Sequence, residues 1–250
     1  MMFYNLSQRR RALIVGAGAL SVVIVIAALV ISRREAGSRS GVPIVVVPGY
    51  GGDASTVKAL VEHLGGTGRR VLALTLPQRG TGDIGRSAQA VARAVAGLDV
   101  RRVDLVGFSA GGIVVRDFIQ LHGGAAVARN VVLLGAPNHG TEITASALGI
   151  DPSLCSGACA QLVPGSSFLR DLNSGDTTPG DATYTSIWTT LDQTVTPPSS
   201  ALLRGADNVR LQEVCPHSRV SHGELVTDSL PVRLVLQAVH GMIKPSRLDC

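Results

Sequence analysis

Val103-Asp104-Leu105-Val106-Gly107-Phe108-Ser109-Ala110-Gly111 joins an apolar run to the helix-like segment 113–121. A serine at a tight strand-to-helix turn needs glycine on both sides, because a Cβ at either place would collide with the neighbouring strand or helix. The pattern Gly-x-Ser-x-Gly therefore predicts that Ser109 is an exposed nucleophile. A chain with 29 glycines can also produce this pattern by chance. An ordinary glycine-rich turn with a capping serine is thus the alternative. The surrounding elements distinguish the two interpretations of Ser109.

Strand-like and helix-like segments alternate along most of the chain. Strands are expected at 42–47, 70–74, 102–106, 130–134, 184–190 and 209–213, and helices at 86–98, 113–121 and 230–239. Such alternation predicts an α/β fold, with a mostly parallel sheet and helices on both faces. Segment 141–182 interrupts it, being rich in Ser, Gly, Pro and Asp. We expect a loop or short cap there, over the carboxyl edge of the sheet where function tends to gather.

The net positive charge of the chain comes from its N-terminal part. The chain has 250 residues, a length that suits one catalytic domain, and its net charge is +5. Residues 1–40 contain six Arg and one Glu, a net of +5, which leaves 17 basic and 17 acidic residues in 41–250. Without a basic stripe in the main part of the chain, nucleic-acid binding is disfavoured.

The N-terminal segment has the pattern of a membrane anchor. Arg9-Arg10-Arg11 precedes 21 uncharged residues, 12–32, and Arg33-Arg34-Glu35 follows them. At about 1.5 Å per residue, a helix of that length matches a hydrocarbon core about 30 Å thick. We expect a basic segment 1–11 inside the cell, an uncleaved transmembrane signal anchor 12–32, a linker 33–41 and an extracytoplasmic catalytic domain 42–250. Residues 8–13 also resemble a twin-arginine export signal, so secretion after cleavage is the alternative.

Four cysteines lie in the part expected outside: Cys155, Cys159, Cys215 and Cys250. An even count in an oxidising compartment predicts two disulfides. Three pairings are possible; a local pair Cys155–Cys159 would leave Cys215–Cys250. A zinc site using Cys215 and His217 is a weaker alternative, since no Cys-x-x-Cys pair of standard spacing is present.

A serine hydroxyl needs an imidazole to take its proton and a carboxylate to orient that imidazole. His222 lies after the expected strand 209–213, in the loop before the last helix, and is our candidate base; His217 in the same loop is the alternative. Asp192 follows the expected strand 184–190 and is our candidate acid. The other candidates are predicted to be structural, solvated or turn-forming: His63, His122, His139, His240, Asp171, Asp176, Asp181 and Asp207.

Two backbone N–H groups are needed to stabilise a tetrahedral oxyanion. Ala110 follows the candidate nucleophile and would supply one. Tyr50 would supply the other, from Pro48-Gly49-Tyr50-Gly51-Gly52, whose glycines let the main chain approach a ligand. A phosphate loop is disfavoured, because no Gly-Lys-Ser or Gly-Lys-Thr follows.

Residues 42–241 resemble the bacterial lipases and esterases of the α/β-hydrolase superfamily, particularly the small secreted group with minimal lids. The resemblance rests on 48–52, 107–111, Leu134-Gly135-Ala136-Pro137-Asn138-His139-Gly140-Thr141, 184–188 leading to Asp192, and Val220-Ser221-His222-Gly223. Many members have His where Pro48 and Phe108 stand here. Neither departure removes a catalytic group, but triacylglycerol specificity is not supported.

The sequence thus predicts a carboxylic ester hydrolase with the triad Ser109, Asp192 and His222, the oxyanion donors Tyr50 and Ala110, and no metal or organic cofactor. Its substrate would be a small-molecule or lipid ester. A thioesterase or an acyltransferase on envelope lipids would use the same triad. A membrane-tethered binding protein with a vestigial hydrolase site is the alternative from another class.

Overall fold

The computed structural model describes residues 41–151, 153, 155–241, 243 and 250. The expected basic segment 1–11, anchor 12–32 and most of the linker 33–41 lie outside these residues. In the part of the chain that the structure describes, no helix is both long and apolar enough to cross a membrane.

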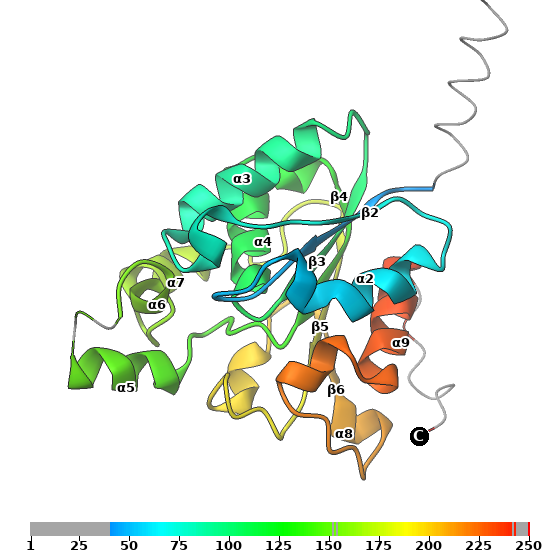
Figure 1. The fold of residues 1–250 in the computed structure, drawn as a ribbon. Helices are drawn as coiled ribbons and strands as arrows, with labels where there is room; N and C mark the ends of the chain where they lie inside the picture. Colours follow the sequence, from blue (N-terminus) through cyan, green and yellow to red (C-terminus); the bar gives the residue numbers. More distant parts are fainter. Residues whose placement is uncertain (1–40, 152, 154, 242, 244–249) are drawn as a thin grey trace, which may run out of the picture. The chain divides into compact units, whose positions relative to one another are not determined.

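A sheet of six strands forms the centre of the domain, and every neighbouring pair is parallel (Figure 1). The strand order is β2-β1-β3-β4-β5-β6. The strands are β1 (Ile44–Val47), β2 (Val71–Ala73), β3 (Val103–Phe108), β4 (Ala128–Leu134), β5 (Thr183–Trp188) and β6 (Asp207–Arg210). All six carboxyl ends therefore meet at one edge. The expected parallel sheet is confirmed.

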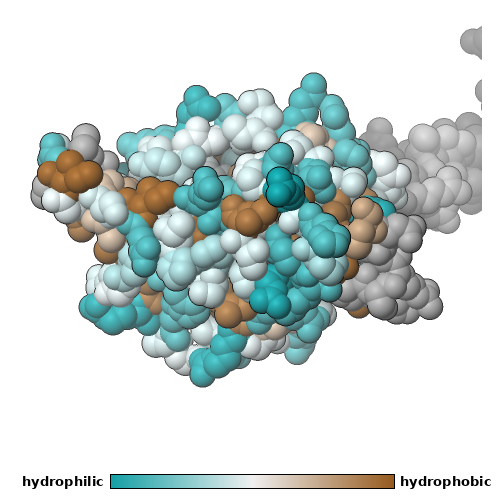
Figure 2. All heavy atoms as spheres, turned by 90° about the horizontal axis from the view of Figure 1, so that it is seen from below, coloured by the Kyte–Doolittle hydropathy of each residue, from teal (hydrophilic) through white to brown (hydrophobic). Residues whose placement is uncertain are grey.

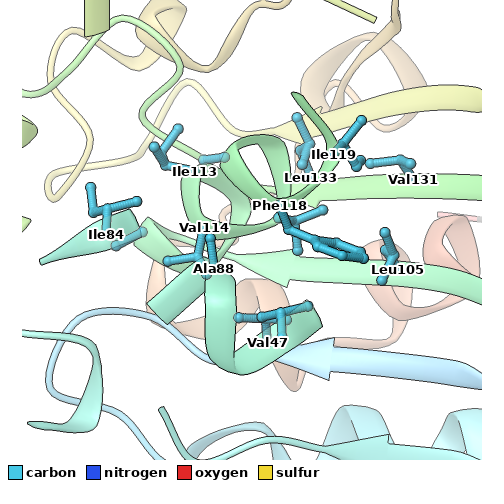
Figure 3. Close-up of a cluster of buried hydrophobic side chains, with 14 of the residues drawn as sticks. Val47, Ile84, Ala88, Leu105, Ile113, Val114, Phe118, Ile119, Val131 and Leu133 are labelled. Atoms are coloured by element: carbon cyan, nitrogen blue, oxygen red, sulfur yellow. The ribbon is translucent and has the colours of Figure 1, made fainter. Parts of the chain in front are cut away.

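Helices cover both faces of the sheet. On one face, α3 (Ile84–Ala96) and α4 (Ala110–Leu121) pack on the strands; Figure 3 shows Ile84, Val114 and Phe118 of these helices against Val47 and Leu105. On the other face, α2 (Lys58–Gly65) and α9 (Ser229–Val239) pack in the same way. Both faces are buried, which is why β1 and the second half of β4 are continuous apolar runs.

Aspartates fix where two of the covering helices begin. Asp83 Oδ1 accepts a hydrogen bond from Arg86 N at the start of α3, at 2.9 Å, and Asp228 Oδ1 accepts one from Leu230 N at the start of α9, at 2.8 Å. Such caps satisfy backbone donors that have no partner within the helix. The loops that lead into α3 and α9 therefore end at defined residues.

Two expectations require correction. The predicted strand 209–213 is wrong beyond Arg210, because its partner β5 ends at Trp188, which pairs with Arg210; residues Leu211–Val214 form the short helix α8 instead. β6 also includes Asp207, predicted to be a turn residue. Segment 141–182 is more helical than expected. It contains α5 (Glu142–Ile150), α6 (Ala158–Gln161) and α7 (Ser167–Leu172), which lie together in Figure 1.

Candidate active site

Ser109 lies between β3 and α4 in a conformation that the flanking glycines make possible. Its φ is 54° and its ψ is −131°, a strained combination for a residue with a side chain. A Cβ on Gly107 would come within 2.5 Å of the Gly112 Cα, and one on Gly111 would come within 2.4 Å of the Pro48 and Val47 carbonyl oxygens. The turn therefore excludes larger residues at both positions, as the sequence analysis expected.

The Ser109 side chain does not cap the helix. It makes no cap hydrogen bond at the start of α4, although Ser109 occupies the N-cap position. Instead its Oγ lies 3.0 Å from His222 Nε2. The alternative interpretation, a turn with a capping serine, is wrong.

His222 connects Ser109 to Asp192. The imidazole Nδ1 lies 2.7 Å from Asp192 Oδ2, and both side chains are buried. Since a carboxylate can only accept, Nδ1 carries the proton in this hydrogen bond, which leaves Nε2 free to accept from the Ser109 hydroxyl. Asp192 Oδ1 accepts from the backbone N–H groups of Thr194 at 2.9 Å and Val195 at 2.7 Å. The carboxylate is thus fixed from both sides.

Thr189 connects the loop of the candidate acid to that of the candidate base. Its hydroxyl donates to the Val220 carbonyl oxygen at 2.7 Å and accepts from Leu191 N at 3.2 Å and Gln212 Nε2 at 3.0 Å. Val220 lies two residues before His222. Sequence reasoning did not find Thr189, because it lies inside the expected strand 184–190; in the structure it directly follows β5.

Two further residues shape the surroundings of His222. Gly135, directly after β4, has a φ of 59°, and a Cβ there would lie 2.6 Å from Leu225 Cδ1 and 3.2 Å from His222 Nδ1. The Phe108 ring lies on β3 with its centroid 5.1 Å from that of the imidazole. Gly135 was predicted only as part of a motif. Its physical role is to leave room for the imidazole and its neighbour Leu225.

The loop after β1 runs directly against Ser109. A Cβ on Gly49 would lie 2.9 Å from the Ser109 Cβ, so only glycine allows this approach. Gly52 N donates to Gly49 O at 3.1 Å, which turns the chain around Tyr50. Ala110 is the first residue of α4, where backbone N–H groups have no partner within the helix. Gly49, which precedes Tyr50, and Ala110 thus both lie next to Ser109.

A cavity of about 250 Å³ opens beside Ser109, and we call it the Ser109 cavity. Tyr50, in the loop after β1, and Ala110, at the start of α4, line it, as do residues of α5 and α6 from segment 141–182. Hollows of 330 to 360 Å³ elsewhere on the domain are larger, but Ser109 lines none of those described. The hydroxyl and the Ser109 cavity therefore form one site.

The alternative base, His217, lies elsewhere. It lines a hollow of about 340 Å³ with Cys215, Arg219 and Arg233, among others. Cys215 is bonded to Cys250, and Cys155 to Cys159. The cysteines thus form two disulfides as predicted, and the zinc alternative is wrong because Cys215 has no free thiolate to offer.

The remaining histidines make local contacts. The Nδ1 atoms of His63 and His240 lie 2.8 Å and 2.6 Å from the carbonyl oxygens of Ala59 and Leu236, each one turn earlier. His122 Nε2 lies 3.3 Å from Asp117 Oδ2. Burial, together with the Arg116 charge, lowers the pKa of His139. Of the histidines, His222 is the one beside Ser109.

Comparison with known proteins agrees with this architecture. Residues 44–239 match the model of the alpha/beta hydrolase family. Lipase B of Aspergillus fumigatus has a similar structure, with a TM-score of 0.71 and 24% identity; the match covers 83% of this chain and 55% of that one, so this chain spans about half its length.

Two bacterial structures have lower identity but are covered almost completely. The mature lipase BlEst2 of Bacillus licheniformis gives a TM-score of 0.62 at 18% identity, over 78% of this chain and 91% of that one. The esterase EaEST of Exiguobacterium antarcticum gives 0.60 at 15% identity, over 80% and 92%. At such identities the likeness is one of fold.

Proposed function

This chain belongs to the alpha/beta hydrolase family, and from that premise we propose that it is a serine hydrolase of carboxylic esters. The observation that carries the proposal is the chain of hydrogen bonds from Ser109 Oγ through His222 to Asp192, with an open cavity beside Ser109. The names of the structural neighbours, two lipases and an esterase, agree with it.

In the first half of the proposed reaction, Ser109 Oγ attacks the ester carbonyl carbon while His222 Nε2 takes the hydroxyl proton. The carbonyl oxygen becomes an oxyanion that accepts hydrogen bonds from the Tyr50 and Ala110 N–H groups. Asp192 holds Nδ1–H and stabilises the imidazolium. The C–O bond to the leaving alcohol then breaks, the alcohol takes the proton from Nε2, and an acyl-serine remains.

In the second half, water replaces the alcohol. His222 Nε2 takes a proton from the water, whose oxygen attacks the acyl carbon, and the proton returns to Ser109 Oγ as the carboxylic acid leaves. If another alcohol entered instead of water, the same residues would catalyse acyl transfer. If the leaving group were a thiol, the enzyme would be a thioesterase. Product analysis with added acceptor alcohols and with thioester substrates distinguishes these cases.

The decisive experiment is labelling with a fluorophosphonate probe together with turnover of p-nitrophenyl esters. Wild type should be labelled and active, and Ser109→Ala should lose labelling and on the order of 10⁴-fold or more in kcat. Ser174→Ala is the matched control, because Ser174 is exposed and its hydroxyl donates to the Asp171 carbonyl oxygen. An unlabelled, inactive wild type would favour a binding protein with a vestigial site. Full activity of Ser109→Ala would overturn the nucleophile.

We also propose that segment 12–32 anchors the enzyme in the cell membrane, with the catalytic domain on the extracytoplasmic side. Three arginines, Arg9-Arg10-Arg11, precede the segment, against a net +1 for Arg33-Arg34-Glu35 after it, which supports this orientation. Two disulfides suit an oxidising compartment. Fractionation of labelled cells tests it. Label in carbonate-washed membranes is expected, whereas label in the culture medium would indicate secretion after cleavage.

A further inference from the structure

The Ser109 cavity lies on the acyl side of the reacting carbon, if the proposed function holds. A leaving alcohol must lie beside His222 Nε2, because it takes the proton from that atom. Tyr50 and Ala110 are among the described residues that line the cavity, and His222 is not. The part of the substrate that enters the cavity is therefore the acyl chain, on the side of the oxyanion donors.

The Ser109 cavity is open at one end and apolar at the other. At its mouth, Tyr50 and Ile143 are each 49% exposed. Its inner end contains Leu162, 3% exposed, and Val195, 1% exposed. Figure 2, the view from below, shows apolar surface at the left-hand end, where α5 lies in Figure 1. Such a gradient suits an alkyl chain that enters at the mouth and is buried along its length.

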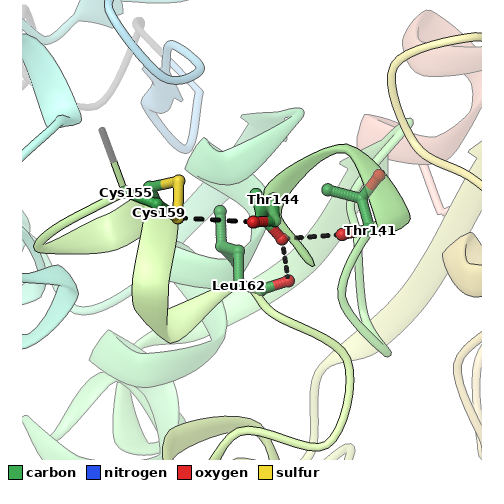
Figure 4. Close-up of a disulfide and its surroundings, with 5 residues drawn as sticks. All are labelled: Thr141, Thr144, Cys155, Cys159 and Leu162. Atoms are coloured by element: carbon green, nitrogen blue, oxygen red, sulfur yellow. Dashed lines mark hydrogen bonds between the residues drawn. A yellow bond between two sulfur atoms is a disulfide. The ribbon is translucent and has the colours of Figure 1, made fainter. Parts of the chain in front are cut away.

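The wall opposite the sheet is a cross-linked cap, which we define as α5, α6 and Leu162. Thr144 Oγ1 donates to the carbonyl oxygens of Thr141 at 2.6 Å and Leu162 at 3.0 Å (Figure 4). The Cys155–Cys159 disulfide lies against α5, with Cys155 Sγ 3.5 Å from the Thr144 carbonyl oxygen. These connections join α5 to α6 and to Leu162, so that the cap is linked together as one unit.

A second set of contacts holds α6 to the sheet side. Ala158 N donates to the Thr81 carbonyl oxygen at 3.1 Å. A Cβ on Gly157 would lie 2.6 Å from that same oxygen, so the two segments approach as closely as glycine allows. The inner end of the Ser109 cavity is thus closed by residues that are fixed on both sides.

We infer that the enzyme selects esters of short and medium unbranched acyl chains, up to about eight carbons, and that Leu162 and Ala147 set this limit. A group the size of a water molecule takes about 30 Å³ of liquid volume, so about eight methylene-sized groups fill the cavity. Leu162 forms the inner end and Ala147 faces the cavity from α5. The inference rests on the proposed ester hydrolysis and adds its substrate class.

The experiment compares kcat/KM for p-nitrophenyl esters of two, four, eight, twelve and sixteen carbons. In wild type, kcat/KM should rise about fourfold per buried methylene up to about eight carbons and fall at least tenfold by sixteen. Leu162→Ala should move the optimum to longer chains by about two or three carbons. Its control is Leu172→Ala, an equally buried leucine on α7 that does not line the cavity and should leave the optimum unchanged.

Ala147→Leu provides a test that does not depend on a buried truncation. It adds bulk on a partly exposed helix position and should shorten the longest accepted chain, whereas Ala145→Leu, on the same helix but outside the cavity, should not. Removing the cap disulfide with Cys155→Ser and Cys159→Ser should broaden the profile, and removing Cys215–Cys250 should leave it as it was.

The outcomes separate the two proposals. A wild type that prefers the sixteen-carbon ester overturns the inference and leaves the hydrolase intact, as does an unchanged optimum in both folded Leu162→Ala and Ala147→Leu. If folded wild type shows neither fluorophosphonate labelling nor ester turnover, the proposed function is overturned, and the inference with it.

Discussion

Phe108 packs against His222, with ring centroids 5.1 Å apart and planes inclined by 31°. Phe108 is the last residue of β3, directly before Ser109, and packs against the apolar cluster on the α2 and α9 face. Asp192 fixes one edge of the imidazole through a hydrogen bond, and Phe108 supports the ring from the strand. The residue before Ser109 therefore helps to orient the His222 imidazole.

Replacing Phe108 should impair catalysis more than binding. An aromatic pair contributes about 0.5–1.5 kcal/mol, so loss of this orientation in Phe108→Ala should lower kcat by about two- to tenfold with little change in KM. Phe108→Leu, which keeps apolar bulk, should retain more of the activity. The measurement is ester kinetics on variants with intact circular dichroism. A kcat equal to that of wild type in folded Phe108→Ala would refute the orienting role.

His222 and His217 should differ sharply when replaced. His222→Ala removes the group beside Ser109 Oγ and should lower kcat on the order of 10⁴-fold or more. His217→Ala changes a separate hollow and should keep kcat within about twofold. Steady-state kinetics of both variants at one pH checks this. The opposite result would make His217 the base.

The position of Ser109 could be predicted from sequence because the Gly-x-Ser-x-Gly pattern occupies five consecutive residues. A Cβ on Gly107 would collide with Gly112 in the same turn. A Cβ on Gly111 would collide with the carbonyl oxygens of Val47 and Pro48, at the end of β1. The parallel sheet was predictable because strand-like and helix-like segments alternate along the chain. Chain order then left few places for a histidine and a carboxylate. The catalytic roles of Asp192 and His222 remain predictions.

Other features depend on contacts distant in the chain. The hydrogen bond from Thr189 to Val220 joins residues 31 apart, and a single threonine gives no sequence signal for it. The end of β6 at Arg210 is set by the end of β5, which the local sequence of β6 does not encode. α5 contains no fully buried residue, so it lacks the periodic burial that identifies a helix within a covering layer.

The Thr189 hydroxyl should matter for both stability and rate. Thr189→Val leaves the Val220 carbonyl oxygen and Leu191 N without their partner, and each buried unsatisfied group costs about 1–3 kcal/mol. Because the two loops carry Asp192 and His222, kcat should fall along with the unfolding temperature. Thr189→Ser keeps the hydroxyl and should preserve most of both, as measured by thermal unfolding and kinetics. Equal behaviour of the Val and Ser variants would show that the hydroxyl is not needed.

Asp117 gives the fold a pH dependence that is independent of the triad. Its side chain lies within α4, and burial raises its pKa above the ordinary value of 3.8; nearby His122 opposes this rise and Asp83 adds to it. The folded protein therefore holds this proton more tightly than the unfolded chain. The resulting stabilisation is fully present below about pH 3.8 and is lost as the pH rises through the raised pKa.

Asp117→Asn should consequently be more stable than wild type at pH 7 to 8, because the amide never acquires the buried charge. Each 1 kcal/mol shifts the unfolding temperature of a domain of this size by about 2–4 °C, so the gain should be measurable as a higher unfolding temperature at neutral pH. The gain should shrink as the pH approaches 4, where the wild-type carboxyl is protonated. Asp181→Asn, at an exposed position, is the control and should match wild type throughout. Scanning calorimetry between pH 4 and 8 measures the difference in unfolding temperature between the variant and wild type. A gain that grows toward acid pH would show that the folded protein stabilises the charged carboxylate, and would contradict the raised pKa.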